Sequence, residues 1–194
     1  MSDGESVEPG IEPHEHKEHA EHAAHSGDPF IIKVSATIAI LAVLAAGVSS
    51  LETVESGFAT EALSEANLFQ NKATDSWSHY QAERLKKTIY DVLAIQSPDK
   101  AGDARKQAQH YDEGSRAIEE DARKLEETVD AREKDSAMHE ARHHRLTIAA
   151  TLLHVGIAIS TIAIIAKGQR WPWYAAVTLG YAGIAVALSA YAIH

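Results

Sequence analysis

The chain contains no cysteine, and this absence removes several classes of chemistry at once. Disulfides, thiolate metal sites and cysteine nucleophiles are all excluded. The sequence also lacks a phosphate-binding Walker loop, a dinucleotide-binding glycine fingerprint and the serine elbow of hydrolases. We therefore expect no enzymatic activity.

Charge is nearly missing from three long stretches, residues 30–51, 146–166 and 173–193. Each holds about 20 mostly apolar residues, which is enough to cross a hydrocarbon layer of about 30 Å as a helix. Asp28 and Pro29 supply a helix N-cap and a first-turn proline for the first stretch. We predict three transmembrane helices, at 29–51, 146–166 and 173–193, with a short loop at 167–172.

Residues 52–145 are rich in charge and follow a helical repeat that is interrupted by a predicted turn at 97–103. Beyond the turn, apolar or small residues recur at alternating steps of four and three: Ala104, Ala108, Tyr111, Ser115, Ile118, Ala122, Leu125 and Val129. This heptad pattern is typical of a coiled-coil seam. The predicted fold is all-α, with three transmembrane helices and a long antiparallel coiled-coil helical hairpin between the first and the second.

The first arm of this hairpin is less regular. One stripe consists of Val54, Phe58, Ala62, Ala66, Phe69, Ala73, Trp77 and Tyr80, and a rotated stripe of Leu85, Ile89 and Val92. We interpret this change as a register shift. Folding the hairpin about residue 100 pairs position i with roughly 200 − i, to within about one helical turn. Ile89 is then expected to face Tyr111, and Trp77 to lie opposite Arg123.

Residues 1–28 form an acidic, polar tail that contains five histidines, His14, His16, His19, His22 and His25. Each of four glutamates has a histidine four positions later, so on a helix the two side chains meet. Such pairs are suited to Zn²⁺, Ni²⁺ or Cu²⁺. A solvated tail that binds metal weakly and a pH sensor are the alternatives.

Three further histidines are candidate ligands. His139 and His143 lie one turn apart and are expected opposite Glu61, as a metal site or as a polar layer that fixes the register. His154 lies inside the second apolar stretch, where it is a candidate for proton transfer or for ligation of a cofactor such as haem. A hydrogen bond to a serine or threonine of the first helix, such as Thr37 or Ser49, is the structural alternative.

Topology and partners follow from charge. The loop 167–170 carries two positive charges, which by the positive-inside rule places the tail and this loop in the cytoplasm and the hairpin outside. The net charge of −10 argues against nucleic acid as a partner. The expected partners are the lipid bilayer and a second copy or a larger membrane complex. Small residues four apart, such as Gly156 with Ser160, are suited to helix contacts within or between chains.

Four segments together resemble one known family. They are NKATDSWSHYQAERLKKTIYDVLA (71–94), ARHHR (141–145), EPHEHKEHAEHAAHSGDPF (12–30) and RWPWY (170–174). The chain resembles the bacterial membrane proteins grouped as domain of unknown function 4337. The resemblance implies a small multi-pass protein of the bacterial plasma membrane with a helical insert and no assigned activity.

From the residues we expect a structural, accessory or assembly component that docks partners or self-associates through its hairpin. One alternative is a metal- or proton-responsive membrane protein that uses the tail. The other is a small subunit of a redox or transport complex in which His154 is a ligand.

Overall fold

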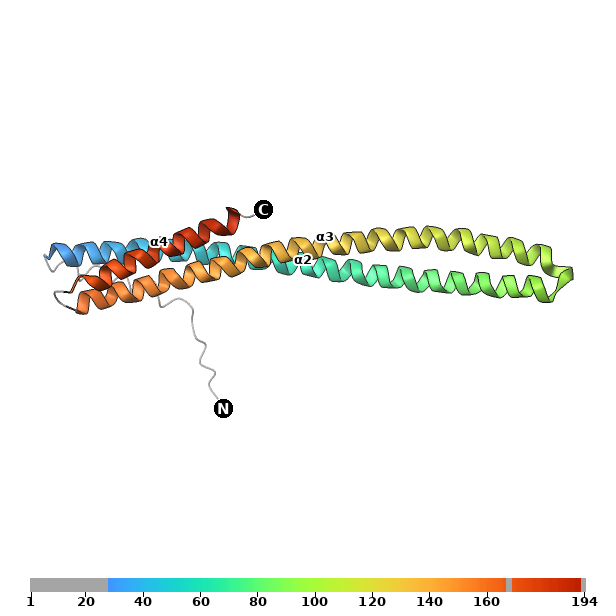
Figure 1. Cartoon of the computed structure of the whole chain (residues 1–194), viewed down its shortest axis with the longest axis horizontal. Helices are drawn as coiled ribbons and strands as arrows, with labels where there is room; N and C mark the ends of the chain where they lie inside the picture. Colours follow the sequence, from blue (N-terminus) through green and yellow to red (C-terminus); the bar gives the residue numbers. More distant parts are fainter. Residues whose placement is uncertain (1–27, 167–168, 193–194) are drawn as a thin grey trace, which may run out of the picture. The chain divides into compact units, whose positions relative to one another are not determined.

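The computed structural model describes residues 28–166 and 169–192, and all the secondary structure in these ranges is helical. The elements are α2 (Pro29–Gln96), the short 3₁₀ helix η1 (Pro98–Lys100), α3 (Ala101–Ile165) and α4 (Trp171–Ala192) (Figure 1). They form two compact units. Unit 1 comprises the described residues of Met1–Ser56 and Glu140–His194, and unit 2 is Gly57–His139. The predicted all-helical class is confirmed.

The connection between α2 and α3 in unit 2 is short. The Ser97 N–H donates to the Leu93 carbonyl at 3.0 Å and closes the end of α2. The Lys100 N–H then donates to the Ser97 carbonyl at 3.0 Å within η1. Gly102 already belongs to α3, so the turn is shorter than the predicted 97–103. Pro98 is the first residue of η1, where a backbone N–H would have no partner within the helix. Proline suits this position because it lacks an N–H.

The two long helices of unit 2 pack antiparallel in the predicted register. Contacts between polar side chains join them, among them Trp77 Nε1 to Glu126 at 2.8 Å, Arg84 to Asp112 at 2.8 Å, and Arg132 to Glu65 at 3.0 Å. The two residue numbers of each pair sum to nearly 200. The guanidinium of Arg123 lies 6.0 Å from the centre of the Trp77 ring, as the pairing predicts. The predicted register is therefore confirmed to within about one helical turn.

The predicted seam of α3 is also confirmed. All eight of its residues from Ala104 to Val129 are buried or half-buried, with Ala122 at 0% and Ser115 at 1% exposure. Most of the buried positions in this seam are alanine or serine, so the helix backbones approach closely. Ser136 continues the seam and donates a hydrogen bond to the Ala59 carbonyl of α2 at 2.9 Å.

The register shift predicted for α2 is wrong. The inward residues of α2 keep an unbroken heptad of Ala62, Ala66, Phe69, Ala73, Ser76, Tyr80, Glu83, Lys87, Tyr90 and Ala94, all buried or half-buried. Leu85, Ile89 and Val92 lie outside, with exposures of 62%, 56% and 44%. These three aliphatic residues thus face away from α3.

Specific contacts hold the polar part of the α2 seam in place. Tyr90, and not the expected Ile89, faces Tyr111 of α3; the two rings stack with centres 5.5 Å apart and an interplanar angle of 17°. Glu83 accepts a hydrogen bond from Lys86 at 2.9 Å, and this bond with its charge attraction raises the pKa of Lys86 above its ordinary value. The long stem of Lys87 lies along the half-buried seam while its ammonium reaches Asp91 at 2.7 Å.

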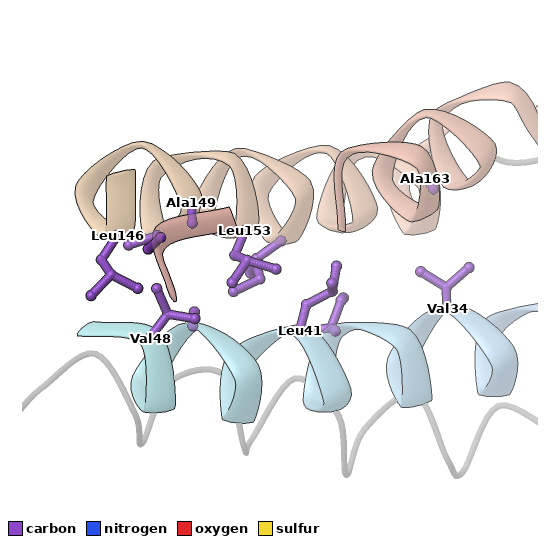
Figure 2. Packing of buried hydrophobic residues seen from close by; sticks show 12 residues of the cluster. Val34, Leu41, Val48, Leu146, Ala149, Leu153 and Ala163 are labelled. Atoms are coloured by element: carbon purple, nitrogen blue, oxygen red, sulfur yellow. The ribbon is translucent and has the colours of Figure 1, made fainter. Parts of the chain in front are cut away.

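Unit 1 has an apolar core between α2 and α3, to which α4 contributes Ala190. In Figure 2, Val34, Leu41 and Val48 of α2 point toward α3, and Leu146 and Leu153 point back toward α2. Both leucines of α3 have 0% exposure. The Phe30 N–H donates to the Asp28 carboxylate at 2.8 Å, which confirms the predicted N-cap of α2.

Glycines bring the three helices of unit 1 together. A Cβ on Gly156 would lie 3.2 Å from the Ala176 carbonyl of α4, and one on Gly180 would lie 2.6 Å from a methyl of Leu41. A Cβ on Gly183 would lie 3.0 Å from Leu153 Cγ and 3.1 Å from the backbone oxygen of Ala149. These small residues thus serve contacts within one chain. All three long helices are long and apolar enough to cross a membrane.

Candidate functional site

A group of polar side chains lies beside the apolar core of unit 1, where α2, α3 and α4 meet. We call it the polar cluster: Glu52, Glu55, Arg142, His143, Thr147 and Tyr191. The two glutamates follow the first apolar stretch on α2, and Arg142 and His143 precede the second on α3. Tyr191 comes from the last turn of α4.

Glu52 binds α3 through both its side chain and its backbone. Thr147 donates its hydroxyl proton to Glu52 Oε1, with 2.6 Å between the oxygens. His143 Nδ1 lies 3.2 Å from the Glu52 carbonyl oxygen. Because a carbonyl can only accept, this contact requires the proton on Nδ1, and Nε2 is then the acceptor of the neutral ring. The contact thus selects one tautomer of His143.

Glu55 is the most buried acid of the cluster, at 5% exposure. Tyr191 donates its hydroxyl to Glu55 Oε1 at 2.9 Å, and the Arg142 guanidinium lies 5.4 Å from the centre of the Tyr191 ring. Arg142 Nε is buried without a hydrogen-bond partner among the described residues. A nearby cation and a hydroxyl donor offset the desolvation of the buried carboxylate.

The polar cluster ties three helices together by hydrogen bonds. Arg145, close to the cluster, donates to the Ser189 carbonyl at 2.8 Å and satisfies an acceptor in the last turn of α4. Over residues 28–166 and 169–192, no group of three or more His, Asp or Glu side chains is arranged to hold a metal ion. The geometry of the cluster is that of a structural layer of hydrogen-bonded polar groups.

The predicted set His139, His143 and Glu61 divides between the two units. His139 belongs to unit 2, where its ring lies 5.3 Å from that of Phe58 and its Nε2 lies 3.7 Å from Asp135. Glu61 is an exposed residue of unit 2, and His143 belongs to the polar cluster of unit 1. The five tail histidines proposed as metal ligands lie outside the described residues.

His154, the predicted cofactor ligand, is exposed on α3. It forms no hydrogen bond with any residue in the described ranges, so the expected bond to Thr37 is absent there. Thr37 instead donates to the Lys33 carbonyl at 2.9 Å and accepts from Trp173 Nε1 at 3.0 Å. The imidazole of His154 therefore faces away from the α2–α3 core.

Comparison with known protein families matches residues 30–193 to a model described as Domain of unknown function (DUF4337). The chain belongs to the DUF4337 family. Comparisons with curated proteins and with solved structures find no match.

Sequence reasoning does not identify the polar cluster of this DUF4337 protein. Glu52 and Glu55 lie three positions apart beside one apolar stretch, and Arg142 and His143 lie beside the next. The acidic and the basic residues of the cluster can therefore be recognised in the sequence. Tyr191 is the residue that joins them, yet in the sequence it looks like an ordinary interfacial aromatic. Only the packing of α4 shows that its hydroxyl reaches Glu55.

Proposed function

We propose that this DUF4337 protein is a membrane-anchored assembly component that docks a partner through its helical hairpin. In this proposal the apolar segments of α2, α3 and α4 span the bacterial plasma membrane, and residues 52–145 form a coiled-coil hairpin. The support is the presence of three helices of sufficient length and apolarity and the seam between α2 and α3.

The observation that carries the docking proposal is an exposed apolar stripe on α2 in unit 2. We call it the α2 stripe: Leu85, Ile89, Val92 and Ile95, with exposures of 62%, 56%, 44% and 81%. The first three are four and three residues apart and therefore share one face of the helix. Full burial of one such side chain contributes about 1.5–3 kcal/mol.

The partner that suits the α2 stripe is an amphipathic helix. A helix can lay its own apolar face along residues at i, i+4 and i+7, and this spacing runs along the outer side of α2. On this part of α2 the polar residues Glu83 and Lys87 face the seam. The hairpin therefore does not use the α2 stripe for its own packing. The stripe is therefore available to another molecule.

Serine substitution at the α2 stripe tests this function. The Leu85→Ser, Ile89→Ser double variant should recover at least about tenfold less of a co-purifying partner from mild-detergent extracts, because two buried apolar contacts are lost. The matched control is Leu63→Ser with Leu68→Ser, whose leucines are 50% and 52% exposed elsewhere on α2. Equal recovery with both double variants contradicts docking at the stripe, and circular dichroism verifies that both remain helical.

We further propose that residues 1–28 and the loop 167–170 lie in the cytoplasm and the hairpin outside. The support is the pair of positive charges in that loop, together with Lys17 and Lys33 on the same side. A cysteine at Ser97 should react with a membrane-impermeant maleimide in intact cells. One at Gln169 should react only after the membrane is permeabilised. The reverse pattern of labelling would invert the orientation.

A further inference from the structure

The apolar segment of α3 is covered on one face and open on the other. Leu146, Ala149, Leu153 and Ile157 belong to the core with α2. On the open side lie five residues: Thr151, His154, Ala158 and Ile165 are exposed, and Thr161 is half-buried. They follow one another at alternating steps of three and four. These five residues therefore form a continuous band about 21 Å long, which we call the α3 stripe.

The α3 stripe carries one polar group, the imidazole of His154, that a hydrocarbon environment cannot satisfy. Thr151 and Thr161 donate to the carbonyls four residues earlier in their own helix, at 2.8 and 3.1 Å. His154 has no such partner in residues 28–166 and 169–192. A neutral imidazole carries one donor and one acceptor, and lipid tails offer neither. An unpaired polar group in hydrocarbon is unfavourable, so His154 requires a polar neighbour from outside the described residues.

We propose that the α3 stripe is the contact surface for a second copy of this chain. The two α3 helices would pack parallel about a two-fold axis perpendicular to the membrane. This inference rests on the proposed membrane location but is independent of docking at the hairpin. Alternating steps of three and four residues are the spacing of left-handed helix pairs. Ala158, one turn from His154, allows the two backbones to approach closely.

A second copy supplies the polar neighbour at the right depth. Two copies inserted in the same orientation place every residue level with its counterpart, so a two-fold axis along the stripe brings His154 to His154. One ring donates its N–H to the unprotonated nitrogen of the other, since each neutral imidazole has both groups. Lipid provides no such group, and an unrelated protein would need a polar side chain at this same depth.

Disulfide crosslinking in native membranes tests the contact surface, and the lack of native cysteine makes single-cysteine variants unambiguous. Ala158→Cys should form a dimer of the chain on oxidation. The control is Ile40→Cys, which is 61% exposed on α2 and adjacent to Leu41, a neighbour of Gly156. It lies at a similar level and should remain mostly monomeric. A monomeric Ala158→Cys, its linkage to a different protein, or equal crosslinking of the control overturns the proposal.

Substitution of His154 tests the hydrogen bond itself. His154→Leu should raise the dimer dissociation constant in detergent about threefold to twentyfold, the range expected for one hydrogen bond between membrane helices. His154→Gln keeps a donor and an acceptor and should remain within about twofold of the parent. A His154→Leu variant that dimerises as tightly as the parent overturns the pairing.

Alkaline extraction of the same membranes separates this inference from the proposed location. A chain that stays in the membrane pellet but does not crosslink through Ala158 overturns only the dimer. A chain released by alkali overturns the membrane proposal itself.

Discussion

Replacing Gly183 with leucine is expected to lower the free energy of unfolding of unit 1 by about 3 kcal/mol. Even a Cβ at this position would lie 3.0 Å from Leu153 Cγ and 3.1 Å from the Ala149 backbone oxygen. A backbone atom of α3 cannot move aside as a flexible side chain can, so α4 must separate from α3. The measurement is thermal unfolding in detergent, where the midpoint should fall by roughly 6–12 °C for a chain of this length.

Gly47→Leu is the matched control for this substitution. A Cβ on Gly47 meets nothing within 4 Å, so leucine there adds no clash and improves the helix propensity of α2. Its midpoint should stay at or slightly above that of the parent. A similar loss for both variants would show that glycine itself, and not the close approach of α4 to α3, determines the stability.

The second large effect is expected at Ala122 in unit 2. This alanine has 0% exposure in the α3 seam, and leucine would force the two helices apart at a cost of about 1–3 kcal/mol. Ala117→Leu is the control, because Ala117 is exposed on the same helix. Hydrogen exchange of the hairpin amides in the full-length protein should accelerate about fivefold to 150-fold for Ala122→Leu only. Unchanged exchange would contradict the tight seam.

The two arms of the hairpin differ in how well the sequence predicts their packing. In α3 one heptad of small and apolar residues forms the seam and charged or polar residues fill most of the other positions, so pattern and structure agree. In α2 the prediction fails because Leu85, Ile89 and Val92 were expected at the seam and are exposed instead. A seam of closely spaced backbones instead accommodates Ala73 and Ala94, while Glu83 and Lys87 reach its edge. With Glu83 and Lys87 at these heptad positions, Leu85 and Ile89 lie outside the seam, although the larger Tyr90 is accommodated within it.

Several contacts of unit 1 depend on how α4 packs against α2 and α3. The sequence does not predict this packing. The N-cap at Asp28 is a local contact, and the sequence predicts it correctly. The hydrogen bond of Tyr191 to Glu55 spans 136 residues and needs three helices in place. His154 is a second residue whose surroundings the sequence predicts only in part. Its depth in the apolar segment can be read from the sequence, but the face of α3 on which it lies cannot.

The α2 stripe has a consequence for how much of this protein a cell can hold. Exposed leucine and isoleucine side chains in a regular row are the features that chaperones and quality-control proteases recognise on incompletely assembled proteins. If a partner covers the α2 stripe, as we propose, covered copies should escape this surveillance and copies made in excess should not. The abundance of the protein would then follow the supply of its partner, which sets a stoichiometry without any dedicated regulator.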